Sequence, residues 1–320
     1  MEMNGLQYGK YTFSCELDSP AILPEYKGST FRGVFGTAFK QVVCALKQRE
    51  CEDCPLRRQC LYTIVFETPL AVAPKEDLRV SVTPHPFVLQ PPETRKQDFA
   101  AGEELQFSLL LFGEVNSQLP FFIHAFQQAG KQGIGKRING RRPTFHLKKV
   151  YANDQVIYAA ETGLLDNAKT AEWLSAAGNS LPVKSSRVRL MLKTPLRLKF
   201  QNRIERDLPF HLLVRAMLRR ISSLFIAYAG DEPDLDYRGL LERAQKVRTE
   251  DKKLFWHDWE RYSNRQKQRM PMSGMAGTVT YEGELGEFLP LIDICSKVNI
   301  GKNTAFGLGK VDYSRLLETS

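Results

Sequence analysis

Four cysteines lie within one short stretch of the N-terminal half, CALKQRECEDCPLRRQC. A close Cys-x-x-Cys pair with flanking cysteines is a strong signal of metal ligation, because thiolates at such intervals can close around one ion or cluster. Zinc sites usually contain two such pairs, whereas this stretch contains only Cys51-x-x-Cys54. The pattern therefore predicts one metal centre, iron–sulfur or zinc, with the ligands Cys44, Cys51, Cys54 and Cys60.

The intervals between these cysteines resemble the iron–sulfur loop of the endonuclease III and adenine glycosylase family of DNA-repair enzymes. The resemblance covers the cysteine stretch only, since the helix–hairpin–helix and catalytic parts of those enzymes are not visible elsewhere in the sequence. It implies a [4Fe–4S] cluster on the four cysteines, with Zn²⁺ as the second choice, and a structural role for the centre. An iron–sulfur DNA-repair enzyme is the remote alternative function.

The composition favours a folded, cytoplasmic protein with a polyanionic partner. The chain has 320 residues, 42% of them hydrophobic, and a net charge of +9, which favours nucleic acid or an acidic membrane surface. The first residues, MEMNGLQYGKYTF, lack the apolar segment of a secretory signal. The longest apolar runs fall far short of the ~18 residues that span a bilayer. We therefore expect a cytoplasmic chain with reduced thiols and no membrane partner.

The chain contains two halves with the same order of landmarks. An alternating strand pattern at 11–17 is followed by a Ser-Pro break and a helical pattern from Phe31. The second half repeats this order, with a strand pattern at 187–193, a Thr-Pro break and a helical pattern from Phe210. Each half then continues with a strand, a helix that begins at Leu-Pro, a glycine-rich basic loop and a last strand. Four matching landmarks in one order indicate an internal duplication.

Strand–helix–strand–helix–strand is the order of the ferredoxin-like split βαβ, which RNA-recognition-motif domains also use. The predicted fold class is therefore α+β, with two tandem ferredoxin-like (RRM-like) domains and a metal-binding insertion that carries the four cysteines. We expect the N-terminal domain at 1–178 with the insertion at 44–60, and the C-terminal domain at 186–320. The intervening stretch AAGNSLPVKSS is typical of a linker.

The glycine-rich loop of the second half is a candidate phosphate-binding site. Glycines without a Cβ allow a phosphate to approach backbone N–H groups, and lysines add positive charge. The loop lacks the GxxxxGK[ST] pattern, and it follows a helix rather than a strand, so it is neither a Walker A loop nor a dinucleotide fingerprint. A plain flexible hairpin is the alternative. The candidate RNA-binding residues here are Gly301, Lys302, Gly307, Gly309 and Lys310.

The two ferredoxin-like halves that end in GKNTAFGLGKVDY resemble the CRISPR-associated RAMP superfamily, whose hallmark is this terminal glycine loop. The stretches PFHLLVRAMLRR, DYRGLLERA and DWERYSNRQKQRM, with the cysteine insertion after FRGVFG, point to the branch that processes CRISPR precursor RNA. The resemblance spans nearly the whole chain. It implies a metal-independent endoribonuclease that binds CRISPR repeat RNA and that associates with other CRISPR effector subunits.

Such an enzyme lets the RNA 2′-OH attack the adjacent phosphate, while protein groups move protons and stabilise the developing charge. Family members often carry a histidine on or near the first helix, but this sequence has Thr37 there and no histidine before His85. This departure favours the alternative of a non-catalytic RNA-binding subunit of a CRISPR effector complex. The candidate catalytic residues are Tyr26, Arg32, Lys40 and His211.

The stretch WHDWERYSNRQKQRM mixes aromatic and basic residues, as surfaces that bind single-stranded RNA do. The spacing of three between Trp256, Trp259 and Tyr262 predicts, for the aromatic residues, the core stripe of an amphipathic helix. For the basic residues we expect contacts with RNA phosphates, with Arg261 and Arg265 as the candidates.

Overall fold

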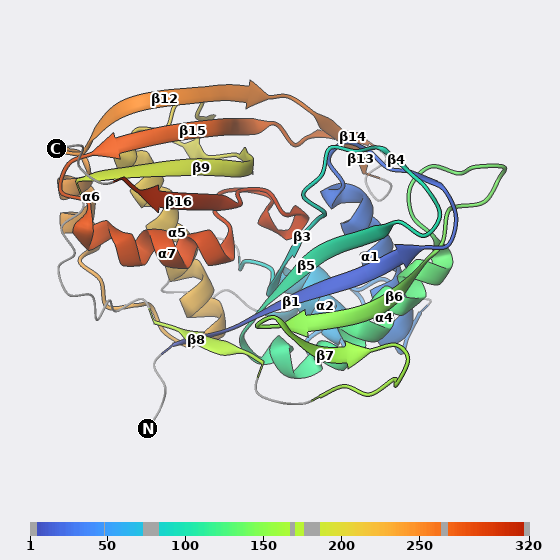
Figure 1. Cartoon of the computed structure of the whole chain (residues 1–320). Helices are drawn as coiled ribbons and strands as arrows, with labels where there is room; N and C mark the ends of the chain where they lie inside the picture. The colour runs from blue at the N-terminus through green and yellow to red at the C-terminus, as the bar shows by residue number, and fades with distance from the viewer. Residues whose placement is uncertain are drawn as a thin grey trace. The chain divides into compact units, whose positions relative to one another are not determined.

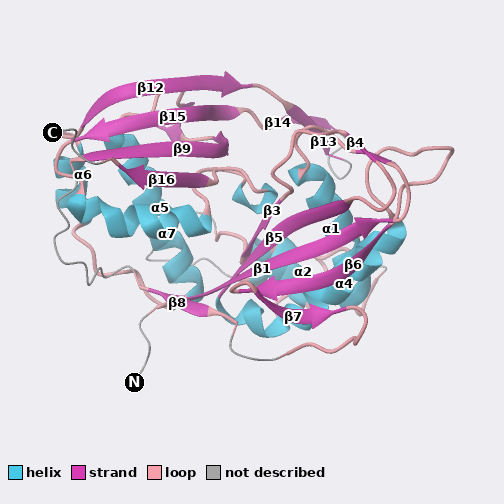
Figure 2. Cartoon of the chain, viewed as in Figure 1, coloured by secondary structure: helices cyan, strands magenta, loops and turns pink. Residues whose placement is uncertain are grey.

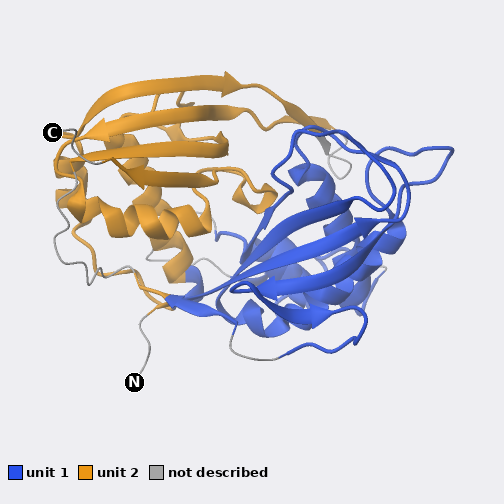
Figure 3. Ribbon diagram, viewed as in Figure 1, with its two compact units in different colours: residues 1, 6–173, 227–229 blue, residues 2–5, 174–226, 230–320 orange. Residues whose placement is uncertain are grey.

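The computed structural model describes residues 5–47, 49–72, 83–166, 170–175, 186–263 and 268–316. The chain divides into two compact units (Figure 3). Unit 1 contains residues 6–173 with 227–229, and unit 2 contains mainly residues 174–226 and 230–320. A search of the described helices finds none with both the length and the apolar character that a membrane span requires.

Unit 1 consists of a six-stranded β-sheet with helices packed against it (Figure 1). Its sheet has the strand order β3-β5-β1-β6-β7, with β8 also paired to β1. The elements of unit 1 are β1 (Leu6–Leu17), β2 (Ala21–Ile22), α1 (Gly28–Val43), α2 (Leu61–Phe66), α3 (Thr68–Ala71), β3 (Phe87–Gln90), β4 (Asp98–Phe99), β5 (Glu104–Phe112), η1 (Gly113–Gln118), α4 (Leu119–Gln132), β6 (Phe145–Ala152), β7 (Gln155–Ala159) and β8 (Glu172–Leu174).

The order of the central strands is that of a split βαβ. All adjacent pairs among β3, β5, β1 and β6 are antiparallel. The two strands joined through α1, β1 and β3, therefore run parallel to each other with β5 between them. In the same way β5 and β6, joined through α4, enclose β1. The two strands that each helix joins are thus separated by one strand of the other βαβ unit. This is the ferredoxin-like arrangement expected from the sequence.

The core of unit 1 is rich in aromatic residues. The burial of one face of β1 confirms the predicted orientation of this strand. Tyr11, Phe13, Cys15 and Leu17 are all buried, as the alternating pattern predicts. Phe13 lies 4.8 Å from Phe126 of α4, and Phe126 stacks at 4.5 Å on Phe35 of α1, measured between ring centroids. Contacts of this kind join both helices to the sheet and add to the free energy of burying the rings.

Unit 2 repeats the arrangement with the strand order β12-β15-β9-β16 (Figure 2). Helices α5 and α7 provide the two crossovers, and all adjacent pairs in the sheet are antiparallel. The elements of unit 2 are β9 (Arg187–Leu196), β10 (Lys199–Phe200), β11 (Arg203–Ile204), α5 (Phe210–Tyr228), α6 (Tyr237–Ala244), β12 (Arg248–His257), β13 (Glu260–Ser263), β14 (Gln268–Pro271), β15 (Gly274–Glu282), η2 (Gly286–Phe288), α7 (Leu289–Val298), η3 (Thr304–Phe306) and β16 (Val311–Arg315).

The equivalent helices α4 and α7 begin in the same way. Each starts at a leucine, Leu119 or Leu289, and carries a proline in its first turn. Proline is favoured there because its fixed φ suits the helix, and its missing N–H would have no intrahelical partner at that position. The landmark read from the sequence therefore marks a helix start in both units.

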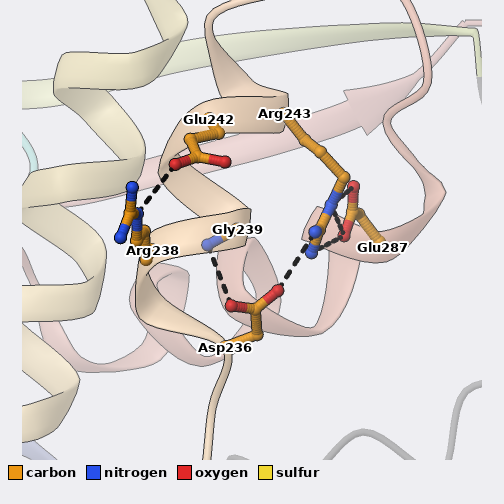
Figure 4. A network of polar contacts seen from close by, with 6 residues as sticks. All are labelled: Asp236, Arg238, Gly239, Glu242, Arg243 and Glu287. Atoms are coloured by element: carbon orange, nitrogen blue, oxygen red, sulfur yellow. Dashed lines mark hydrogen bonds and ion pairs between the residues drawn. The ribbon is translucent and has the colours of Figure 1, made fainter.

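A polar network anchors α6 in unit 2 (Figure 4). Asp236 caps the helix by accepting a 2.9 Å hydrogen bond from the backbone N–H of Gly239. Its second oxygen lies 3.1 Å from Arg243, whose guanidinium also bonds Glu287 at 2.8 Å. Arg238 and Glu242 form a separate pair one turn apart. The network ties the ends of α6 to η2, an element that lies far along the chain.

The prediction of an amphipathic helix for WHDWERYSNRQKQRM is wrong. Trp256 belongs to β12 and Trp259 to the connection that follows it, while residues 260–263 form β13, which pairs with β14 as a hairpin. The spacing of three therefore joins side chains of different elements. Aromatic residues also favour strands, and the pairing of β12 with β15 outweighs the local helical pattern.

Candidate functional site

The terminal glycine loop, residues 299–310, is packed closely against the end of β9. The backbone N–H of Lys302 donates to Arg197 O at 2.9 Å, and that of Gly309 donates to Pro195 O at 3.0 Å. Asn299 is fully buried and donates from its side chain to the carbonyls of Gly307 and Leu308. The loop is therefore a fixed part of unit 2, held by backbone and side-chain hydrogen bonds.

The glycines of the loop have a conformational role. Gly307 and Gly309 have φ of +83° and +71°, a region that L-residues with a side chain rarely adopt. A Cβ on Gly309 would stand 1.7 Å from Ile300 O. The N–H groups of Gly307 and Gly309 donate to Thr304 O and Pro195 O. These two donors are thus already used within unit 2.

Lys302 is exposed and lies in a cluster of cations. Partial burial lowers the pKa of its ammonium, and the charges of Lys199, Arg219 and Arg197 lower this pKa further. Like charges are held together here at an electrostatic cost, which an anion would relieve. We call Arg197, Lys199, Arg215, Arg219 and Lys302 the basic surface of unit 2.

Helix α5 contributes a stripe of three residues to the same region. His211, Arg215 and Arg219 recur at intervals of four and therefore share one face of the helix. Both arginines are exposed and His211 is half-buried. Arg215 also lies over the Phe200 ring of β10, 5.0 Å from its centroid. Sequence reasoning selected His211 alone, although the basic residues at helical spacing in PFHLLVRAMLRR were a usable signal for the two arginines.

Arg261 supports the terminal loop from the β13–β14 hairpin. Its guanidinium lies 4.4 Å from the centroid of the Phe306 ring in η3, and one of its nitrogens lies 3.2 Å from Met270 Sδ. Burial lowers the pKa of this guanidinium, and its buried Nε has no hydrogen-bond partner among the described residues. Arg261 therefore packs on the predicted RNA-binding loop. The other candidate of this stretch, Arg265, lies outside the described residues.

Lys310 closes the loop through its backbone. Its N–H donates to Thr194 Oγ1 at 2.9 Å, and its carbonyl accepts from the N–H of Lys193. Thr194 in turn donates to Gly307 O at 2.8 Å. At Gly301, φ is +83° and a Cβ would stand 2.6 Å from Arg197 O. Lys310 thus ties the loop to β9, and Gly301 allows the loop backbone to approach Arg197 just after β9.

The three candidate catalytic residues of unit 1 have different neighbours. Arg32 lies over the rings of Phe66 and Phe87, at 5.1 and 5.8 Å from their centroids. Lys40 is eight residues further along α1, about 12 Å along the helix axis, and lies over the Tyr62 ring.

Burial raises the pKa of the third candidate, Tyr26, so its hydroxyl stays protonated at neutral pH.

Lys27, just before α1, is a buried cation that sequence reasoning missed. Its side chain is fully buried, and its Nζ donates to the carbonyls of Pro24, Glu25 and Thr94, the last at 2.7 Å. Burial lowers the pKa of this ammonium. The lysine fixes the entry to α1 by joining two segments that lie far apart in the sequence, so no local pattern could reveal it.

The predicted metal-binding insertion is not seen among the described residues. Cys54 is buried, whereas Cys44, Cys51 and Cys60 are half-buried. Burial raises the pKa of the Cys51 thiol, Lys40 lowers it, and Glu67 and Cys60 raise it. Among the described residues, no three His, Cys, Asp or Glu side chains are placed to share a metal ion. Ligation by the four cysteines remains a prediction from their spacing.

Two family models match the chain, one in each half. The first is AF_1859_N, an N-terminal domain, which matches residues 6–170, more than half of the chain. The second describes the CRISPR-associated endoribonuclease Cas6 and matches residues 190–311. The chain belongs to the AF_1859_N family, and its residues 190–311 form a domain of the CRISPR-associated, RAMP-type Cas6 family. A curated relative, an uncharacterized protein of Archaeoglobus fulgidus, is 24% identical over 90% of this chain and 91% of its own length.

Solved structures of the Cas6 family share the fold. Thermus thermophilus Cas6 superposes with a TM-score of 0.54 at 14% identity, covering 97% of this chain and 99% of its own. A Cas6 product complex gives a TM-score of 0.55 at 14% identity, with 97% and 100% coverage. A partial Cas6-RT-Cas1–Cas2 complex gives 0.58 at 12% identity and covers 99% of this chain but 48% of that one. At such identities the likeness concerns the fold alone.

Proposed function

We propose that this protein binds CRISPR repeat RNA on the basic surface of unit 2 and cleaves CRISPR precursor RNA there. The observation that carries the proposal is the convergence of Lys302, Arg219 and Lys199 beside the face of α5 that begins with His211. Family membership supports CRISPR-associated RNA processing or binding as the general role.

The binding step follows from the charges. Among the described residues, Lys199, Arg215, Arg219 and Lys302 form no ion pair, so their charges are available to phosphates. Each phosphate neutralised by a cation releases counterions, which makes binding fall with salt. Arg215, fixed over Phe200, presents a planar guanidinium suited to a phosphate.

The cleavage step requires groups that move protons. In the proposed reaction the 2′-OH of the nucleotide before the cut attacks the neighbouring phosphorus, and the bond to the 5′-oxygen breaks. His211 takes the role of general acid or base, and the cations stabilise the charge that develops on the phosphate. Arg32, Lys40 and Tyr26 of unit 1 are the second set of candidates. In this scheme no metal ion takes part.

A non-catalytic RNA-binding subunit is the second candidate function. It is favoured by one specific feature, the absence of histidine before His85, which leaves α1 with Thr37 and no imidazole. Thr37 donates its hydroxyl to Gly33 O within the helix, as threonine in a helix often does. In that case the basic surface would hold the RNA without cutting it.

Single-turnover cleavage of cognate repeat RNA separates the two functions. We expect cleavage in EDTA, and its loss when the nucleotide before the cut carries a 2′-deoxy sugar, because that sugar lacks the nucleophile. His211→Ala is expected to slow cleavage by ~100-fold or more, with little change in RNA affinity. Binding without cleavage by the parent protein would favour the non-catalytic subunit. An unchanged rate in His211→Ala would move the search to Tyr26, Arg32 and Lys40.

A further inference from the structure

The segment between α4 and β6 in unit 1 is a basic hairpin that the proposed function does not use. Residues 133–144 leave the sheet of unit 1 as an extended loop, drawn in green in Figure 1. Ile138 and Arg141 exchange two backbone hydrogen bonds of 2.8 and 3.1 Å. Asn139 and Gly140 between them both have positive φ, 50° and 79°. This is the two-residue turn that matches the twist of paired strands, so the tip has a defined shape.

The base of the hairpin is fixed to unit 1. The N–H of Ile134 donates to Pro143 O at 2.8 Å, and both residues are buried. The N–H of Lys136 donates to Ile22 O at 3.0 Å. Gly135 has φ of +82°, and a Cβ there would stand 2.5 Å from Ile22 O, so glycine permits this close approach. The side chains beyond the base are therefore carried on a preorganised arm.

The hairpin carries four exposed cations, Lys136, Arg137, Arg141 and Arg142. Among the described residues none of the four forms an ion pair, and only Arg137 has a side-chain bond, 3.3 Å to the backbone carbonyl of Gly140. Other cations of unit 1 are neutralised, such as Lys148 by Glu16. The sequence from 115 to 153 contains no aspartate or glutamate. The hairpin thus concentrates uncompensated positive charge.

We propose that the basic hairpin, residues 133–144, is a second RNA-binding surface, which contacts the phosphate backbone independently of base sequence. This inference rests on the proposed function, because both concern the same RNA. Arginines suit phosphates because their planar guanidinium can form two parallel hydrogen bonds. A rigid arm with its charges displayed binds without an ordering cost. The hairpin lacks exposed Trp, Phe or Leu, which a helix or loop inserted in a membrane would present.

The double variant Arg141→Ala/Arg142→Ala tests this surface in the full-length protein. For two lost contacts with a single strand, the slope of log affinity against log salt should fall by about 1.4, which is roughly a tenfold loss of affinity at ~150 mM salt. The loss should be the same for the repeat RNA and for an RNA of equal length and unrelated sequence. The turn keeps its backbone hydrogen bonds, so the circular dichroism spectrum and Tm should match those of the parent.

Two control variants make the result specific. Arg238→Ala/Arg248→Ala removes the same charge from ion pairs on unit 2 and should leave affinity and slope unchanged. Arg141→Lys/Arg142→Lys keeps the charge and should retain most of the parent's slope of log affinity against log salt. Equal loss in the unit 2 control would show a general charge effect and overturn the proposal.

The outcomes separate this inference from the proposed function. If the hairpin variant binds as the parent does while Lys302→Ala weakens binding, the hairpin proposal is wrong and the proposed function stands. If the parent binds neither RNA, both are wrong. Binding of the parent to phosphatidylserine vesicles that the hairpin variant loses, with RNA affinity unchanged, would assign the hairpin to a membrane surface instead.

Discussion

Lys302 of the terminal loop and Arg219 of α5 lie close enough for the arginine to lower the pKa of the lysine, although they are far apart in the sequence of unit 2. Two cations held together in this way repel each other, and a bound anion would relieve this repulsion. The loop hydrogen bonds to Arg197 and Pro195 fix the lysine in this place.

The first prediction concerns this pair. Lys302→Ala and Arg219→Ala should each weaken binding of repeat RNA and reduce its salt slope by about 0.7, the value for one phosphate contact on a single strand. Fluorescence anisotropy at several salt concentrations measures both quantities. The losses in the double variant should be less than additive, because removing one cation relieves repulsion on the other. Arg238→Ala, in an ion pair on α6, is the control. Binding equal to the parent in both single variants would remove the site from the basic surface.

The second prediction concerns Gly309. A Cβ at this position would collide with Ile300 O in addition to the strain of positive φ. Gly309→Ala should therefore destabilise the protein by more than about 2 kcal/mol. Gly102→Ala is a matched control, since Gly102 has φ of +79° and nothing within 4 Å of a Cβ. Urea unfolding of both variants separates the collision from the strain. Equal losses of stability in the two variants would mean that the terminal loop shifts to accommodate the new methyl group.

The third prediction concerns the buried Lys27. Lys27→Met keeps the length of the side chain but leaves three carbonyl acceptors without their donor. We expect a loss of about 1–3 kcal/mol in the free energy of unfolding. Lys96→Met is the control, because Lys96 lies over the same Phe99 ring, at 5.2 Å against 5.6 Å for Lys27, but is half exposed. A variant as stable as the parent would show that the ammonium bonds are offset by the cost of burying the charge.

The fourth prediction concerns pH and Asp236. The hydrogen bond from Gly239 lowers the pKa of this carboxyl, and Arg243 lowers it further. The carboxylate therefore stabilises the fold above its unfolded pKa of about 4, and the contribution disappears as pH falls through the lower folded value. Asp236→Asn keeps the helix cap but removes the charge. Its Tm should lie slightly below that of the parent at neutral pH, and the two should converge at acid pH. A constant difference across this range would exclude the charge as the cause.

The fifth prediction concerns the cysteines. We propose from their spacing that Cys44, Cys51, Cys54 and Cys60 bind a [4Fe–4S] cluster, with zinc as the alternative. Anaerobically purified protein should then be brown, with about four irons per chain. Colourless protein that contains one zinc ion per chain would support zinc in place of the cluster. Cys54→Ser should lower metal content and Tm, whereas Cys295→Ser, at a lone buried cysteine, should leave the metal content unchanged. If protein without iron or zinc is as stable as the parent, both the cluster and the zinc ion are rejected.

The sequence by itself determined the order of the core strands and helices in each half. The alternation in β1 and the proline in the first turn of α4 and α7 are local signals. Side chains alternate between the two faces of a strand, and the ring of proline fixes its own φ. The repetition of these signals predicted two ferredoxin-like halves, and the strand order in each unit agrees.

The tertiary structure decided what each candidate residue contacts. Lys27 is buried because carbonyls of two separate segments surround it, and Arg261 lies over Phe306 because a hairpin meets the terminal loop. The N–H of Gly309 is already bonded to Pro195 O, so this glycine shapes the loop while Lys302 carries the charge. These outcomes depend on groups far apart in the chain, and periodicity or propensity contains no information about such contacts.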